Sequence, residues 1–89
     1  SQRVPASEVR DRLAERGLLG FVALIARESG VLLADMLDLG VRPRSVSRAR
    51  RRMWARLRVE YGFSLNEIAY LFGCNHTSVL AGSRKAGER

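Results

Sequence analysis

Four consecutive polar residues, Asn75, His76, Thr77 and Ser78, carry the side chains best suited to binding chemistry. Their amide, imidazole and hydroxyl groups can hydrogen-bond to the edges of DNA bases, and the methyl group of Thr77 can contact the methyl group of thymine. Asn75 can cap a following helix and can also prefer adenine. If a helix begins here, its exposed backbone N–H groups favour a phosphate. We therefore interpret this segment as a candidate site for reading bases.

The positive charge of the chain is concentrated in residues 41–59. This segment has eight arginines and no acidic residue. Residues 1–40 carry five basic and six acidic side chains and residues 60–89 carry three of each, so the segment accounts for the whole formal charge of +7. Like charges repel one another in a compact domain and become favourable beside a polyanion, which predicts a nucleic acid or an anionic surface as partner. The arginines are Arg42, Arg44, Arg48, Arg50, Arg51, Arg52, Arg56 and Arg58.

Catalytic and metal-binding chemistry is poorly supported. His76 is the only histidine and Cys74 the only cysteine, so together they cannot complete a zinc site. No Ser-His-carboxylate arrangement is indicated, and the Gly-x-x-x-x-Gly-Lys loop that binds nucleotide phosphates is absent. We expect no enzymatic activity, no cofactor and no bound metal. Cys74 is expected to be a small buried residue in a turn.

Residues 64–86 have the spacing of a helix-turn-helix. Residues 64–67 read Ser-Leu-Asn-Glu, which predicts a capping box at the start of the first helix. Ala69 must be small where the second helix crosses, Gly73 suits a turn residue with φ > 0, and Val79 fills the space between the helices. Such a motif presents the N-terminal end of its second helix, here residues 76–86, to the major groove.

The upstream sequence also has helical periodicity. Residues 1–17 are interpreted as a linker or a short helix capped by Ser7, and a helix over residues 18–29 should end at Gly30. A short helical pattern follows in residues 33–39. No segment shows the alternation of a strand. We therefore predict an all-α fold, a compact bundle of about five helices.

A long helix is expected after a basic loop over residues 40–46. Ser45 or Ser47 can cap it, and Gly62 should stop it. Trp54 lies at the margin of its apolar face and, like Tyr61, is expected to pack against the core rather than to stack on bases. The arginines occupy the other faces, either as phosphate contacts or as a solvated surface. The apolar stripe consists of Val46, Ala49, Met53, Leu57 and Tyr61.

From residue 19 to residue 85 the chain resembles the C-terminal DNA-binding domain of the bacterial chromosomal replication initiator DnaA. The resemblance implies a Trp-repressor-like helix-turn-helix over residues 18–89 and sequence-specific binding of double-stranded DNA, as at a replication origin. The matching stretches are Ala34-Asp35-Met36-Leu37, Arg42 to Arg48, Ala49-Arg50-Arg51-Arg52-Met53, Ser64-Leu65-x-Glu67-Ile68, Phe72-Gly73 and His76-Thr77-Ser78-Val79-Leu80.

In that family a His-Thr pair reads bases in the major groove, and an arginine of the basic loop enters the adjacent minor groove. The resemblance implies base contacts by His76, Thr77 and Arg44, and Asn75 is expected to contact a base through its own amide group. Arg42 and Arg48 are alternatives to Arg44 as the minor-groove arginine. Contacts to the DNA backbone are expected from Arg42, Arg48, Arg50, Arg51, Arg52, Leu65, Asn66, Ser78 and Arg84.

The turn of the motif departs from the family pattern. The family has Gly-Gly-Arg-Asp-His-Thr-Thr where residues 73–78 read Gly-Cys-Asn-His-Thr-Ser, which is one residue shorter and lacks the Arg-Asp pair. A guanine reader and a carboxylate are therefore missing. Asn66 also replaces the usual proline. The shorter turn is more similar to the DnaA-like module attached to transposase-like proteins, so the initiator's own binding site is not assumed.

Length and composition favour a single small domain. The chain has 89 residues, 46% of them hydrophobic, one cysteine and no apolar stretch as long as a membrane span. A cytoplasmic, nucleoid-associated protein without membrane or small-molecule partners is expected, as a whole protein or as part of a longer chain or complex. A protein-interaction adaptor that uses the arginine face and a binder of structured RNA are the alternatives.

Overall fold

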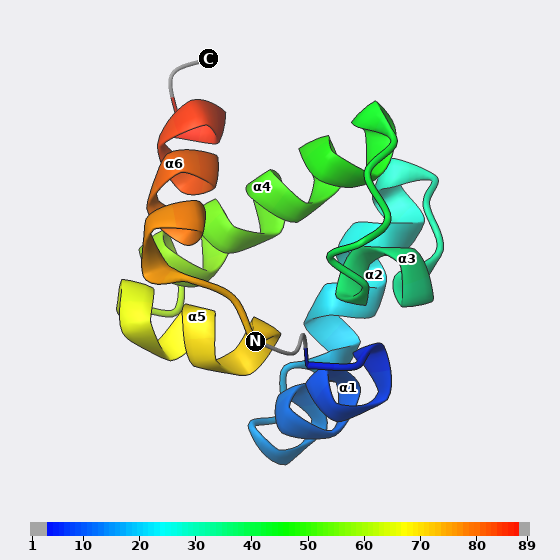
Figure 1. Ribbon diagram of the computed structural model, residues 1–89, viewed down its shortest axis with the longest axis horizontal. Coiled ribbons are helices and arrows are strands. Elements are labelled where there is room, and N and C mark those ends of the chain that lie inside the picture. The colour runs from blue at the N-terminus through cyan, green and yellow to red at the C-terminus, as the bar shows by residue number, and fades with distance from the viewer. Residues whose placement is uncertain (1–3, 88–89) are drawn as a thin grey trace.

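The computed structural model describes residues 4–87, and their side chains as far as residue 82. Within this range the chain forms helices and no strand (Figure 1), which confirms the all-α prediction. About five helices were predicted and six are found. None of them is long and apolar enough to cross a membrane. They are α1 (Ala6–Glu15), α2 (Leu19–Ser29), α3 (Leu33–Leu37), α4 (Arg44–Val59), α5 (Leu65–Phe72) and α6 (His76–Gly87).

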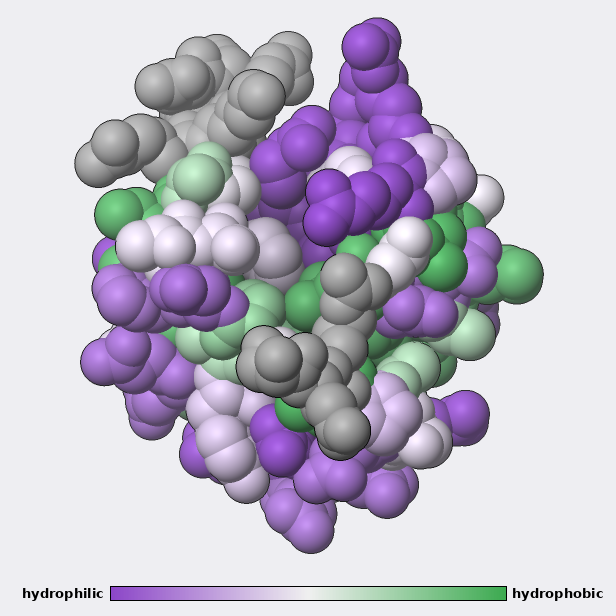
Figure 2. Space-filling model, viewed as in Figure 1, coloured by the Kyte–Doolittle hydropathy of each residue, from purple (hydrophilic) through white to green (hydrophobic). Residues whose placement is uncertain are grey.

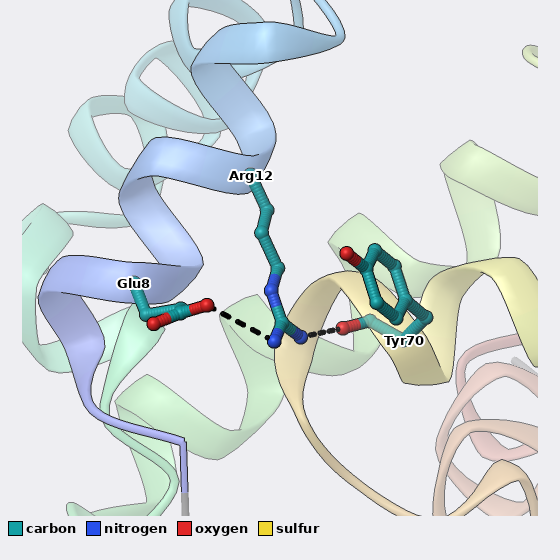
Figure 3. Close-up of polar contacts among 3 residues, drawn as sticks. All are labelled: Glu8, Arg12 and Tyr70. Carbon is teal, nitrogen blue, oxygen red and sulfur yellow. Dashed lines mark hydrogen bonds and ion pairs between the residues drawn. The ribbon is translucent and has the colours of Figure 1, made fainter.

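Helix α1 packs into the core. Pro5, and not Ser7, occupies the position before its first turn, and Val9 and Leu13 on its inner side are fully buried. Arg12 reaches from α1 to α5 (Figure 3): its guanidinium donates to the carbonyl oxygen of Tyr70 and lies 4.3 Å from the centre of the Tyr70 ring. The same guanidinium forms an ion pair with Glu8 at 3.2 Å. Helix α1 therefore supports the C-terminal end of α5.

Helix α4 occupies the middle of the bundle, where it contacts α2, α3 and α5 and packs most extensively against α6 (Figure 1). The predicted stripe is buried at Val46, Ala49, Met53 and Leu57. Trp54 is only 6% exposed and meets Phe72 edge-on, with ring centroids 6.1 Å apart, which confirms that it packs in the core. Burial of each large apolar side chain on this face contributes about 1.5 to 3 kcal/mol.

Both ends of α4 differ from the prediction. The helix begins at Arg44, after Pro43, so neither Ser45 nor Ser47 is its cap. The fixed φ of proline suits the residue that leads into a first turn, which explains the earlier start. The helix ends at Val59, and Tyr61 therefore lies outside it, 45% exposed. Its ring still packs at the margin of the core, against Phe21, with ring centroids 4.9 Å apart.

The helix-turn-helix forms as its local signals predict. The Glu67 backbone N–H donates to Ser64 Oγ at 3.1 Å and the Ser64 N–H donates to the Glu67 carboxylate at 2.8 Å, which completes the capping box. Gly73 has a φ of 66°, in the left-handed region that only glycine adopts at low cost. Ala69 and Val79 are buried between α5 and α6. The turn thus fixes how α6 leaves α5.

Candidate nucleic-acid interface

Helix α6 begins with an exposed group of polar side chains, which we call the polar tip: Asn75, His76, Thr77 and Ser78. The next residue, Val79, is completely buried. The helix is therefore anchored on its inner side while its first turn faces solvent. The structure brings together the four consecutive residues for which DNA contacts were predicted.

Asn75 caps α6. Its side-chain oxygen Oδ1 accepts from the backbone N–H of Thr77 at 3.0 Å and from the Thr77 hydroxyl at 3.0 Å. The capping role that the sequence allowed is therefore present. An Asn that pairs with adenine must accept from the base through this same oxygen. In this structure only the Nδ2 amino group of Asn75 is left to face a partner.

Gly82 brings α6 close to α4. A β-carbon at position 82 would lie 2.9 Å from Cε3 of Trp54 and 3.2 Å from Cγ of Arg51. Because real β-carbons essentially never come within 3.0 Å of another heavy atom, a larger residue would require the Trp54 ring or one of the two helices to shift. The polar tip is consequently held at a fixed place beside α4.

Four of the arginines lie along one side of α4, because their spacing of four, three and seven residues returns to the same face of a helix. None of the four forms an ion pair in the part of the chain that the structure describes. Hydrophilic side chains gather over the N-terminal half of α4, next to α6 (Figure 2). We call the four arginines on this side of α4 the arginine row: Arg44, Arg48, Arg51 and Arg58.

Two other arginines of α4 point toward α2. Arg52 donates to the hydroxyl of Ser29 at 3.4 Å. Arg56 forms a two-pronged bond with the Glu60 carboxylate at 2.9 and 3.0 Å and lies 5.1 Å from the centre of the Phe21 ring. The side-chain hydrogen bond between Arg56 and Glu60 raises the pKa of Arg56 and lowers the pKa of Glu60. Of the two, only Arg52 was predicted to contact DNA, and it lies outside the arginine row.

Arg50, for which a contact to the DNA backbone was predicted, is mostly enclosed by the protein. Its side chain is 6% exposed and points into the protein. Nε donates to the carbonyl oxygen of Met36 at 2.9 Å, and Nη2 lies 2.8, 3.0 and 3.3 Å from the carbonyl oxygens of Asp35, Asp38 and Val41. The guanidinium therefore fastens α4 to the end of α3 and to the loop that follows, and its Nε and Nη2 donors are used within the protein.

The electrostatics of Arg50 agree with its enclosure. Burial lowers the pKa of Arg50, Asp38 opposes this effect, and Arg42 reinforces it. A sequence signal for this position did exist. Arg50 lies four residues after Val46 and four before Trp54, both of them buried, so helical spacing puts it within the apolar face.

Two adjoining hollows separate α4 from the start of α6, with volumes of about 280 and 240 Å³. The residues that line both of them are Ser47, Arg50, Trp54 and Ser78, while Arg51 borders one and Arg42 the other. No acidic side chain of the described residues lines either hollow. The indole Nε1 of Trp54 is buried without an acceptor. The surface around the polar tip is therefore rich in hydrogen-bond donors and positive charge.

The start of α5 is less suited to a phosphate than predicted. Leu65 is half-buried and packs against the core, whereas Asn66 is exposed. The hydrogen bond from the backbone of Ser64 lowers the pKa of Glu67, with a further contribution from the Ser64 hydroxyl. Glu67 is therefore a carboxylate at neutral pH, and its negative charge lies where the helix N-terminus would attract an anion.

Cys74 is half-buried in the turn and packs against the core, and burial raises the pKa of its thiol. It is therefore a protonated packing residue. No group of three metal-binding side chains occurs in the described part of the chain. Arg84 belongs to α6, but its side chain lies outside the part that the structure describes.

Comparisons of the chain with protein-family models, with curated proteins and with solved structures gave no match. What the surface can bind must then be inferred from its geometry and charge. Two features stand out: hydrogen-bonding side chains at the start of α6, and arginines without acidic partners along the neighbouring α4.

Proposed function

We propose that the protein binds double-stranded DNA in a sequence-specific manner, with α6 in the major groove and the arginine row along the flanking phosphates. The observation that best supports this proposal is the close packing of α4 against α6 at Gly82, which holds the polar tip beside the arginine row. Base edges need hydrogen-bonding side chains, and phosphates need positive charge. The two requirements meet on neighbouring helices.

The resemblance to the initiator's C-terminal domain suggests where the arginines act. Arg42, Arg44 and Arg48 are all exposed and lie in or next to the first turn of α4, so each of them can enter the minor groove beside the site read by α6. Origin binding in replication and a DnaA-like module of a transposase-related protein are the two biological settings we consider. Selection from random duplex DNA separates them, because an initiator-type site favours the first and an unrelated or hairpin-associated site favours the second.

The proposal predicts a strong dependence of affinity on salt. If four to six arginines neutralise phosphates, log affinity plotted against log salt concentration should fall with a slope of about −4 to −5. Fluorescence anisotropy with a labelled duplex, measured over roughly 50 to 200 mM salt, gives this slope. A flat salt dependence is incompatible with the proposal.

A protein adaptor is the second candidate, because an arginine row without acidic partners can also bind an acidic peptide. The same anisotropy measurement, repeated at one salt concentration with an acidic peptide and with an RNA duplex, distinguishes the candidates. Tighter binding of the peptide than of DNA would favour the adaptor. The exposed polar tip argues against it, since protein interfaces are usually apolar at their centre.

Alanine substitutions should separate base contacts from phosphate contacts. His76→Ala and Thr77→Ala are each expected to cost about 1 to 3 kcal/mol on the selected site and little on random duplex DNA, whereas Arg51→Ala should weaken binding to both alike. Ser7→Ala, an exposed residue on α1 without a capping bond, serves as the control and should change neither affinity. The reverse pattern would exchange the roles we assign to the polar tip and the arginine row.

A further inference from the structure

We infer that Thr77 selects a base bearing a major-groove amino group, adenine or cytosine, because Asn75 fixes the direction of the Thr77 hydroxyl proton. This inference rests on the proposed function, since it concerns how the polar tip meets DNA. Asn75 acts as a positioning residue: it controls what Thr77 can offer to a base.

The backbone first fixes the orientation of the Asn75 amide. A backbone N–H can only donate, so the atom that lies 3.0 Å from the Thr77 nitrogen must be the amide oxygen and not the amide nitrogen. An amide oxygen has no hydrogen to give. The Thr77 hydroxyl, 3.0 Å from the same oxygen, must therefore donate its only proton to Asn75.

The remaining hydrogen-bonding capacity of the pair follows directly. The Oγ1 atom of Thr77 keeps its lone pairs and no outward proton, so it can accept but not donate. The Oδ1 atom of Asn75 already accepts two hydrogen bonds, which leaves only the Nδ2 donors of that residue. Both side chains are exposed, so these groups face solvent at the start of α6.

The major groove distinguishes bases by such capacities. Adenine and cytosine present amino donors there, whereas guanine O6 and thymine O4 are acceptors. A threonine with a free hydroxyl pairs with either kind, but Thr77 would place a lone pair against an acceptor. Rotating its proton toward guanine or thymine would break the bond to Asn75, so we expect a preference of about five- to tenfold for amino-bearing bases.

The test is a selection from random duplex DNA with the wild type and three variants: Thr77→Val, Asn75→Asp and Asn75→Ala. The position read by Thr77 is the one at which base frequencies differ between the wild type and Thr77→Val, which has the same shape but no hydroxyl. Wild type should enrich adenine or cytosine there. Asp can accept both hydrogen bonds, so Asn75→Asp should keep that preference at lower overall affinity. Asn75→Ala frees the proton and should admit guanine and thymine.

Removing a single group from the DNA gives a second readout. The selected base is replaced by its analogue without the amino group, purine for adenine or 2-pyrimidinone for cytosine. Wild type should lose about five- to tenfold in affinity, and Thr77→Val should lose nothing. Circular dichroism of each variant confirms that α6 still forms.

Several outcomes would overturn the inference while leaving the proposed function intact. In the selection, these are enrichment of guanine or thymine at the position read by Thr77, or an unchanged base preference in Asn75→Ala. In the measurement with base analogues, the contradicting result is that wild type loses no affinity when the amino group is missing. A loss of affinity in Thr77→Val that is equal on all sequences, as a phosphate contact would give, would also overturn the inference. Failure of the wild type to bind duplex DNA or to enrich any sequence would instead refute the proposed function, and the inference with it.

Discussion

Replacing Arg50 with methionine is expected to lower the free energy of unfolding by about 3 kcal/mol, because carbonyl oxygens at the end of α3 and in the next loop lose their donor. Methionine fills most of the volume, so the loss reports the hydrogen bonds rather than a cavity. Urea denaturation followed by circular dichroism measures the change. Amide hydrogen exchange should speed up most in residues 35–41, which the guanidinium fastens to α4.

The same substitution one residue later is the matched control. Arg51 is half-buried, makes no side-chain hydrogen bond within the described residues, and keeps its stem against Gly82 when changed to methionine. The free energy of unfolding of the Arg51→Met variant should differ from that of the wild type by no more than about 0.5 kcal/mol. Equal stability of Arg50→Met and Arg51→Met would contradict the structural role of Arg50. Arg50→Lys should recover only part of the loss, since an ammonium cannot reach several carbonyls at once.

Neutralising part of the arginine row should have the largest effect on DNA binding. In the triple variant Arg44→Gln, Arg48→Gln, Arg51→Gln, three charge-assisted bonds to phosphates are lost, each worth about 1.5 kcal/mol, so affinity for any duplex should fall by roughly a thousandfold. The salt slope should become less steep by about three. Glutamine keeps the aliphatic stem, so the packing of Arg51 on α6 is preserved. Anisotropy titrations at several salt concentrations measure both quantities.

A second triple variant separates location from net charge. Arg10, Arg16 and Arg27 are exposed and lie outside residues 41–59, so changing them to glutamine removes the same charge away from the arginine row. The proposal predicts a loss of less than about tenfold in affinity and a nearly unchanged salt slope. If both triple variants lost affinity equally, general attraction between a basic protein and DNA would explain the binding, and the arginine row would have no special role.

The parts of the fold that local sequence signals determine were predictable. The Ser64 and Glu67 capping box, the helix stop at Gly30 and the left-handed turn residue Gly73 each depend on neighbours within a few residues. The buried stripe of α4 follows from helical spacing in the same way.

Other features depend on partners that are distant in the sequence. The arginine block was visible, but the enclosure of Arg50 requires the end of α3, and the pairing of Arg52 with Ser29 requires α2. Residue type suggested a surface position for Arg50, and that suggestion outweighed the helical spacing that places it in the apolar face. Tyr61 was assigned to the stripe of α4 because the helical pattern was extended past the true end of that helix.

The exposed position of the polar tip at the start of α6 followed from the sequence, but its hydrogen-bonding capacity was not predictable. A sequence shows that Asn75 and Thr77 are two positions apart, and both were treated as independent readers. Their mutual hydrogen bond depends on the rotamers that the first turn of α6 allows. In the proposed complex, that bond would change which bases the pair can accept.

The absence of a side chain at Gly82 has a consequence for the length of the DNA site. Because α6 rests directly on Trp54 and on the stem of Arg51, the two helices cannot slide or separate without losing that contact. If the proposed complex forms, the distance along the duplex between the bases met by α6 and the phosphates met by α4 is then set by the protein. In the proposed complex, a base pair inserted between those two points would shift the phosphates by about 3.4 Å along the axis and out of helical phase. The protein would therefore measure spacing as well as sequence.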